Sequence, residues 1–176
     1  MPTEFFLDPQ QISFDRVIFD RTAIRARNPH RFEMEYLDGI VLYEPEQHLA
    51  VGFHDLKADA FWTRGHIPNN PIFPGALMIE SGGQLSSFCY QEHYGPDDSR
   101  FFGFGGIDKV KFRGMAKPGQ RLVLICKAVV MNRRFSRFAI QGAVENRMVF
   151  EGEITGIAMP VKADLTTGTR VNEAGA

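Results

Sequence analysis

One segment constrains this chain more than any other: residues 74–90, PGALMIESGGQLSSFCY, carry a single charged side chain, Glu80. Pro74 is favourable in a first helical turn, and the dense apolar positions after it predict a helix that is buried on nearly all sides. Gly82 and Gly83 each weaken a helix by about 1 kcal/mol relative to alanine. Such glycines are tolerated where the backbone must approach a sheet or a partner closely, so we expect other structure to wrap around this helix.

Most of the remaining chain has residue patterns typical of β-strands. Residues 40–57 predict two strands around the turn-like EPEQ. Four β-rich runs follow the helix and are separated by AKPGQ, NRR and ENRM, which suit hairpin turns; they cover residues 101–115, 121–132, 135–146 and 148–160. Strands, one long helix and then four strands in an antiparallel meander predict an α+β fold, with a curved antiparallel sheet around one long central helix.

The length of 176 residues suits one domain with tails. Residues 1–27 are expected to form an N-terminal extension with a short helix, because apolar residues from Val17 to Ile24 lie near helical spacing and Pro29 ends any helix there. Residues 28–161 are then the main domain. Residues 162–176 are polar and rich in Gly and Thr, which predicts a flexible tail.

Composition excludes several functional classes. With 20 Lys+Arg against 21 Asp+Glu, the formal net charge of −1 gives no overall field for nucleic acid. No apolar run approaches the roughly 20 residues of a membrane span, and Cys89 and Cys126 lie in apolar surroundings typical of core residues in a reducing compartment. We expect a cytoplasmic protein without nucleic-acid or membrane partners, without metal and without cofactor. Four histidines lack metal-ligand spacing and are expected to be structural or exposed: His30, His48, His54 and His93.

Two side chains near the helix start suggest acid–base chemistry. His66 lies in a loop whose direction is fixed by Gly65 and Pro68. Glu80 lies within the apolar helix, where burial should raise its pKa, as a proton-donating acid requires. The alternative is a structural carboxylate that pairs with a nearby arginine such as Arg64. At this point both interpretations of Glu80 remain open.

Gly75, directly after Pro74, supplies a third group. Its N–H has no partner within the helix and lies at the positive end of the helix dipole, which suits an oxyanion or a carbonyl oxygen. Together the three groups match proton transfer next to a carbonyl. A neutral His66 would remove the proton α to a thioester, Gly75 would hold the enolate-like oxygen, and the Glu80 carboxyl would protonate a leaving β-hydroxyl.

The motif GHIPNNPIFPGALMIESGGQ, with NPHRF upstream and FGGIDKVKFRGMAKPGQ downstream, resembles a known family. It is similar to the hot-dog-fold 3-hydroxyacyl-[acyl-carrier-protein] dehydratases of the FabZ type, from about Asn28 to Pro160. The resemblance implies that His66 is the catalytic base and Glu80 the acid, and that the Gly75 amide polarises the thioester. It also implies that the Ile72 carbonyl orients the histidine ring and that Gln84 occupies the family's glutamine position near the site.

The resemblance further implies an acyl-carrier-protein partner and a homodimer or trimer of dimers, with His66 and Glu80 contributed by different subunits. Basic side chains that could dock an acidic carrier are Arg113, Lys117, Arg133, Arg134 and Arg137. Aromatic residues are core by default, with one or two expected to line an acyl tunnel: Phe61, Trp62, Phe73, Phe101, Phe102 and Phe104.

The chain departs from the family pattern at three places. Ile67 stands where the family usually has Phe, ESGGQ replaces EAMAQ, and EMEYLDGI replaces PFLLVDRV. None of these changes removes a catalytic group, but they leave acyl length, carrier and pathway open. Two alternatives remain: a hot-dog acyl thioesterase in which Glu80 activates water, which the presence of His66 argues against, and a non-catalytic acyl-binding partner subunit that keeps the pocket.

Overall fold

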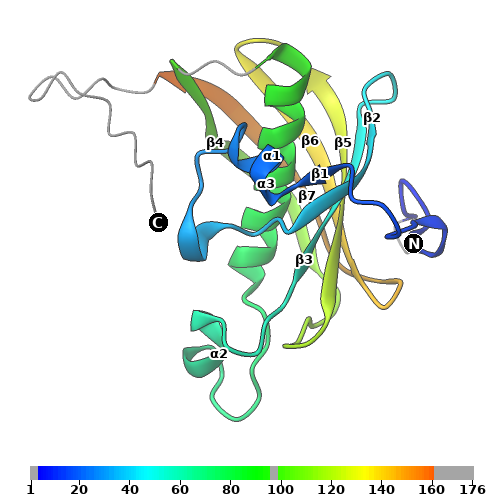
Figure 1. Ribbon diagram of the computed structural model, residues 1–176, viewed down its shortest axis with the longest axis vertical. Helices are drawn as coiled ribbons and strands as arrows, with labels where there is room; N and C mark the ends of the chain where they lie inside the picture. Colours follow the sequence, from blue (N-terminus) through cyan, green and yellow to red (C-terminus); the bar gives the residue numbers. More distant parts are fainter. Residues whose placement is uncertain (1–3, 96–98, 161–176) are drawn as a thin grey trace, which may run out of the picture.

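A seven-stranded antiparallel sheet wraps around one long helix, α3 (Gly75–Tyr94), in the computed structural model, which describes residues 4–95 and 99–160 (Figure 1). The helix follows Pro74, whose carbonyl accepts the N–H groups of Leu77 and Met78. The strands are β1 (Phe19–Asp20), β2 (Gly39–Glu44), β3 (Leu49–Asp55), β4 (Arg100–Phe112), β5 (Arg121–Met131), β6 (Phe135–Val144) and β7 (Arg147–Pro160). The expected α+β architecture, with a curved sheet around a central helix, is confirmed.

The strand order, β1-β2-β3-β5-β6-β7-β4, corrects one expectation. Strands β5, β6 and β7 form the predicted meander, but β4 pairs with β7 and lies at the edge of the sheet, while β5 pairs with β3. The segment AKPGQ does make a turn, with the Gln120 N–H bonded to the Lys117 carbonyl, yet the strands on its two sides are not neighbours. Turn composition is local and does not decide which strands pair.

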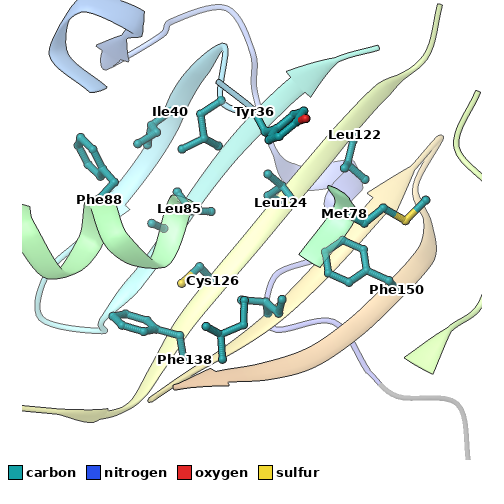
Figure 2. Close-up of a cluster of buried hydrophobic side chains, with 14 of the residues drawn as sticks. Tyr36, Ile40, Met78, Leu85, Phe88, Leu122, Leu124, Cys126, Phe138 and Phe150 are labelled. Carbon is teal, nitrogen blue, oxygen red and sulfur yellow. The ribbon is translucent and has the colours of Figure 1, made fainter. Parts of the chain in front are cut away.

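Helix α3 ends four residues later than predicted, at Tyr94 instead of Tyr90. Gly95 follows it, and its positive φ of 82° suits a residue without a side chain. Its apolar side chains point at the sheet (Figure 2). The cluster shown there is buried and includes Met78, Leu85, Phe88, Leu124, Cys126, Phe138 and Phe150. This packing is what holds the helix across the sheet.

The two glycines of α3 allow the close approach that their positions predict. A Cβ on Gly82 would lie 2.7 Å from Ile140 Cδ1 on β6, and one on Gly83 would lie 2.4 Å from the Phe104 ring on β4. The helix is less apolar than expected, because buried polar side chains run along it: Ser81, Gln84, Ser86, Ser87 and Gln91.

The N-terminal segment joins the sheet through β1, which pairs with β2. The expected short helix is α1 (Arg21–Arg25), capped by Asp20, whose Oδ1 accepts the Ala23 N–H at 2.8 Å. Val17 and Ile18 precede this helix and are exposed, so it is shorter than their spacing suggested. The 3₁₀ turn η1 (Pro9–Gln11) lies near the start of the chain. Apolar side chains on both sides of this turn pack against a second buried cluster, which is formed by Leu49, Val51 and Ile125.

The remaining short elements are the 3₁₀ turn η2 (Phe32–Met34) and the helix α2 (Phe61–Gly65). Cys89 and Cys126 are buried free thiols, as expected of core residues. Within residues 4–95 and 99–160, no helix is both long and apolar enough to cross a membrane. The predicted tail, residues 162–176, lies outside the described residues.

Candidate active site

His66 is held at the end of α2 by its backbone and by its ring. Its N–H donates to the Trp62 carbonyl at 2.8 Å, and its Nδ1 lies 2.8 Å from the Ile72 carbonyl oxygen. Because a carbonyl can only accept, Nδ1 carries the proton of the neutral ring and Nε2 keeps its lone pair. The contact expected between Ile72 and the histidine is therefore present, and it leaves Nε2 able to accept a proton.

The loop after His66 has an unusual backbone. Ile67 has φ 60° and Asn69 has φ 70°, in the left-handed region that a β-branched residue such as isoleucine rarely adopts. Such strain persists where the surrounding structure imposes it, and it clusters at functional sites. In Figure 1, α2 and this loop extend beyond the end of the sheet, away from its centre.

Glu80 contacts two side chains through the same oxygen. Gln84 Nε2 donates to Glu80 Oε1 at 2.8 Å, and His30 Nε2 lies 3.3 Å from it. Within the described part of the chain, Oε2 has no hydrogen-bond partner, and Arg64 does not pair with this carboxyl. The structural alternative of an Arg64 ion pair is therefore wrong, since His30 and Gln84 take that place.

The expected rise in the pKa of Glu80 is also wrong. Burial raises the pKa of this carboxyl, but the hydrogen bonds from His30 and Gln84, with the attraction of His30, together hold it below its ordinary value. Two donors that favour the charged form outweigh the desolvation of a partly buried carboxylate. In the single chain Glu80 is thus an ionised hydrogen-bond acceptor at neutral pH.

Gln84 is fixed on every side. Its Nε2 donates to Glu80 and also to the Met34 carbonyl at 2.7 Å, and its Oε1 accepts the Tyr36 N–H at 2.9 Å. The side chain of Asn28 donates to the Gln84 backbone carbonyl at 2.8 Å. This amide therefore supports Glu80 from inside the protein, and its contact with a substrate stays a prediction.

Gly75 opens α3, and a Phe112 ring from β4 lies directly over it. A Cβ added at Gly75 would come within 2.7 Å of that ring, so only glycine fits under it without displacing the ring. The N–H of a residue in the first helical turn has no acceptor inside the helix. The geometry is compatible with the expected oxyanion donor, and that role also stays a prediction.

A cavity of about 280 Å³ lies between α3 and the edge of the sheet. Glu80 and His30 are among its polar lining groups, and its walls include three of the aromatic residues considered for an acyl tunnel, Phe101, Phe102 and Phe104. His66 does not line it. Within one chain, the described His66 and Glu80 therefore do not share this cavity.

Sequence comparison decides the family. The family model described as the FabA-like domain matches residues 28–153, which is most of this chain. The chain belongs to the FabA-like domain family. A 3-hydroxyacyl-[acyl-carrier-protein] dehydratase, FabZ, of Saccharophagus degradans is 31% identical over 141 residues, covering 78% of this chain and 95% of the relative. The expected family resemblance is confirmed.

Solved structures share the fold of this FabA-like domain at much lower identity. The dehydratase heterocomplex ApeI:P of Xenorhabdus doucetiae matches with a TM-score of 0.66 at 13% identity, covering 77% of this chain and 90% of that one. A hypothetical thioesterase of Streptococcus pneumoniae, solved with coenzyme A, matches with a TM-score of 0.53 at 10% identity, covering 70% and 87%. These likenesses show the hot-dog fold expected from the sequence.

His30 is the residue of this FabA-like domain that sequence reasoning missed. It was expected to be structural or exposed, yet it lines the cavity and contacts Glu80. Its Nε2 faces the carboxylate, while its Nδ1 is buried without a hydrogen-bond partner in the described part of the chain. The available signal was its place in NPHRF, the upstream part of the motif, and spacing alone could not show that this segment meets α3.

Proposed function

We propose that this protein removes water from a 3-hydroxyacyl thioester to give the trans-2-enoyl thioester, in fatty-acid or related acyl-chain synthesis. The observation that carries the proposal is the placement of Glu80, a carboxylate at a cavity whose walls are otherwise largely apolar, in a FabA-like domain. Such a cavity can take an acyl chain and present its polar head to the carboxylate. The FabZ relative carries the same activity in its name.

In this mechanism His66 is the base. Its Nε2 lone pair, kept free by the bond between Nδ1 and Ile72, takes the proton α to the thioester carbonyl. The Gly75 amide stabilises the negative charge that develops on the carbonyl oxygen. The bond between the β-carbon and its oxygen then breaks, and the electron pair left at the α-carbon forms the double bond.

Glu80 acts as an ionised group in this scheme. Its Oε2, which has no partner among the described residues, accepts a hydrogen bond from the substrate hydroxyl and orients this group to leave. Its Oε1 stays bound to Gln84 and His30. The proton that completes the water molecule comes from the protonated His66. One proton thus moves from carbon to the leaving oxygen, one water is lost, and no other reactant is required.

The proposal includes a homodimer, because one chain does not bring His66 to the cavity of Glu80. Strand β4 is the natural interface: it is an edge strand, and exposed apolar side chains lie along it, namely Phe104, Ile107 and Phe112. Pairing two β4 edges would satisfy unpaired backbone groups and cover these side chains. The projecting loop of each protomer then reaches its partner's cavity. A trimer of such dimers remains a further prediction.

The carrier is the remaining part of the proposal. An acyl carrier protein is acidic, and exposed basic side chains such as Lys117 and Arg134 offer it complementary charge. Arg113 is a weaker candidate because it is ion-paired with Glu151. A cytoplasmic location fits this substrate and the buried free thiols.

One assay tests the proposed function. Purified protein is incubated with a 3-hydroxyacyl or crotonyl thioester, and enoyl absorbance and free thiol are followed together. We expect the enoyl signal to change without release of thiol. Thiol release would show a thioesterase instead, and neither signal would show a non-catalytic acyl-binding subunit.

A further inference from the structure

Ser87 lies on the same stripe of α3 as Glu80 and faces the same cavity. Glu80, Gly83 and Ser87 follow at i, i+3 and i+7, and all three line it. Seven residues of helix place Ser87 about 10 Å beyond Glu80 along the axis. The Phe104 ring packs against Gly83 between them, since an added Cβ there would lie 2.4 Å from it. A chain bound at Glu80 therefore reaches Ser87 by passing beside this ring within the same cavity.

The hydroxyl of Ser87 differs from those of the other serines in this helix. Ser81 Oγ donates to the Leu77 carbonyl at 2.7 Å, and Ser86 Oγ donates to the Gly82 carbonyl at 2.9 Å. Ser87 is 2% exposed, and its Oγ has no hydrogen-bond partner in the part of the chain that the structure describes. Unlike Ser81 and Ser86, it does not donate to the backbone carbonyl four residues earlier.

The side chains that line the cavity near Ser87 are apolar. The wall of the cavity includes Phe101, Phe102 and Ile154. Phe102 stacks on Tyr90, with ring centroids 4.5 Å apart, and the Tyr90 hydroxyl is already bound to the Arg133 carbonyl. A buried hydroxyl without a partner is destabilising and is uncommon in native proteins. The other polar side chains on the described cavity wall, His30 and Glu80, belong to the opposite end of the helical stripe.

We propose that Ser87 is a specificity-determining residue: the acyl chain taken by this site carries a second oxygen, a hydroxyl or keto group, about two helical turns from the reacting hydroxyl. Ser87 hydrogen-bonds to that oxygen and so distinguishes an oxygenated chain from a plain hydrocarbon chain. This inference rests on the proposed function, because it takes the cavity of Glu80 as the acyl site. A site built to bind a substrate hydroxyl discriminates strongly against a chain that lacks it.

The test uses 3-hydroxyacyl thioesters of one chain length, either plain or carrying a second hydroxyl at successive carbons. We expect wild-type protein to prefer one hydroxylated isomer over the plain chain by about 10-fold or more in kcat/KM. Ser87→Ala should abolish that preference by slowing the hydroxylated substrate, with the plain chain unchanged or better. Ser86→Ala is the matched control, because its hydroxyl is bound inside the helix; it should keep the preference.

Binding separates this inference from the proposed function. Calorimetry with saturated, unreactive thioesters, plain and hydroxylated, measures the same preference without turnover. Suppose no enoyl product forms, but the hydroxylated thioester still binds with a lower Kd than the plain one and Ser87→Ala removes this difference. That result would refute the proposed function and leave the role of Ser87 standing. A wild-type protein that binds plain chains as well as every hydroxylated isomer would overturn the role of Ser87, as would a Ser87→Ala protein that keeps the preference. Ser87→Cys, a near-isosteric weak donor, serves the same purpose if the alanine variant does not fold.

Discussion

His30 Nε2 lies 3.3 Å from Glu80 Oε1, so two segments fifty residues apart meet at the carboxylate of the candidate site. His30 and Gln84 both donate to that oxygen, and together they overcome the effect of burial and lower the pKa of Glu80. The lowered pKa favours an ionised Glu80 carboxylate, so the proposed mechanism uses it as a hydrogen-bond acceptor and not as a proton-donating acid. In the proposed mechanism His30 is therefore a positioning residue for Glu80.

His30→Leu should lower kcat/KM more at low pH than at high pH. Without His30, burial raises the pKa of Glu80, and a smaller fraction of the carboxyl is ionised in acid. We expect a loss of about 10-fold near pH 6 that shrinks toward pH 8. His30→Gln, which keeps a donor, should recover part of the activity, and the exposed His93→Gln is the control. A loss that is the same at every pH would show that His30 only supports the fold.

Glu80→Gln should keep the fold and lose turnover. The amide is nearly isosteric, but it removes the negative charge that holds the substrate hydroxyl, so we expect kcat to fall by about 10² or more. Because the pKa of Glu80 lies below its ordinary value, the carboxyl stays ionised from pH 6 to pH 9, and the loss should be similar across that range. Thermal melts and pH–rate profiles measure both points.

Glu92→Gln gives the matched control for Glu80, since Glu92 lies on the same helix but binds Arg27 at 2.9 Å. It should turn over normally. An alkaline fall in the pH–rate profile that is present in the wild type and missing in Glu80→Gln would show that Glu80 donates a proton after all. Early melting with normal turnover would mark Glu80 as structural.

His66→Ala should lower the rate by about 10² to 10⁴, the usual contribution of a positioned general base. If His66 and Glu80 come from different subunits, mixing His66→Ala with Glu80→Gln protein and allowing exchange should restore about a quarter of wild-type activity, since each mixed dimer then holds one intact site. Mass spectrometry confirms that mixed dimers form. Mixed dimers without activity would contradict the shared site.

Ile107→Lys should weaken the dimer. Ile107 is 46% exposed on the edge strand β4, where a charge would be buried on pairing with a second copy. We expect sedimentation to show monomers at concentrations where the wild type is dimeric, with a parallel loss of activity. Val129→Lys, on β5 and 56% exposed, is the control and should leave assembly intact. An active monomer would contradict both the interface and the shared site.

Asp38 should govern part of the acid stability. Burial raises the pKa of this carboxyl, but the His54 ring at 2.8 Å, the Asp55 N–H and Arg21 lower it to about 2. A carboxyl whose pKa is lower in the folded than in the unfolded chain stabilises the fold at pH values above its unfolded pKa. That contribution is lost as pH falls from about 4 toward 2.

Asp38→Asn is therefore expected to reduce the free energy of unfolding by about 1–2 kcal/mol at pH 7. The difference from wild type should shrink as pH falls toward 2, when measured by urea denaturation. The exposed Asp59→Asn is the control and should be neutral. A difference between Asp38→Asn and wild type that does not change with pH would show that Asp38 acts through packing and not through its charge.

The sequence by itself determined the central helix, the strands around it and the residues of the motif. Each of these features depends on a short stretch of sequence: Pro74 before a dense apolar run, β-rich runs between turns, and a loop histidine near the start of the helix. The position of His66 next to the Ile72 carbonyl followed the family resemblance because both lie within one short loop. Local steric and capping preferences act over a few residues, so a linear pattern can report them.

Only the tertiary structure decided which distant groups meet. It placed β4 beside β7 although its nearest later strand in sequence is β5, and it brought His30 to Glu80. It also left the Ser87 hydroxyl without a partner among residues 4–95 and 99–160, while Ser86, its neighbour in the chain, is bonded. Pairing of distant strands, the pKa of a carboxyl and the partner of a hydroxyl depend on distances in space, which the order of residues does not contain.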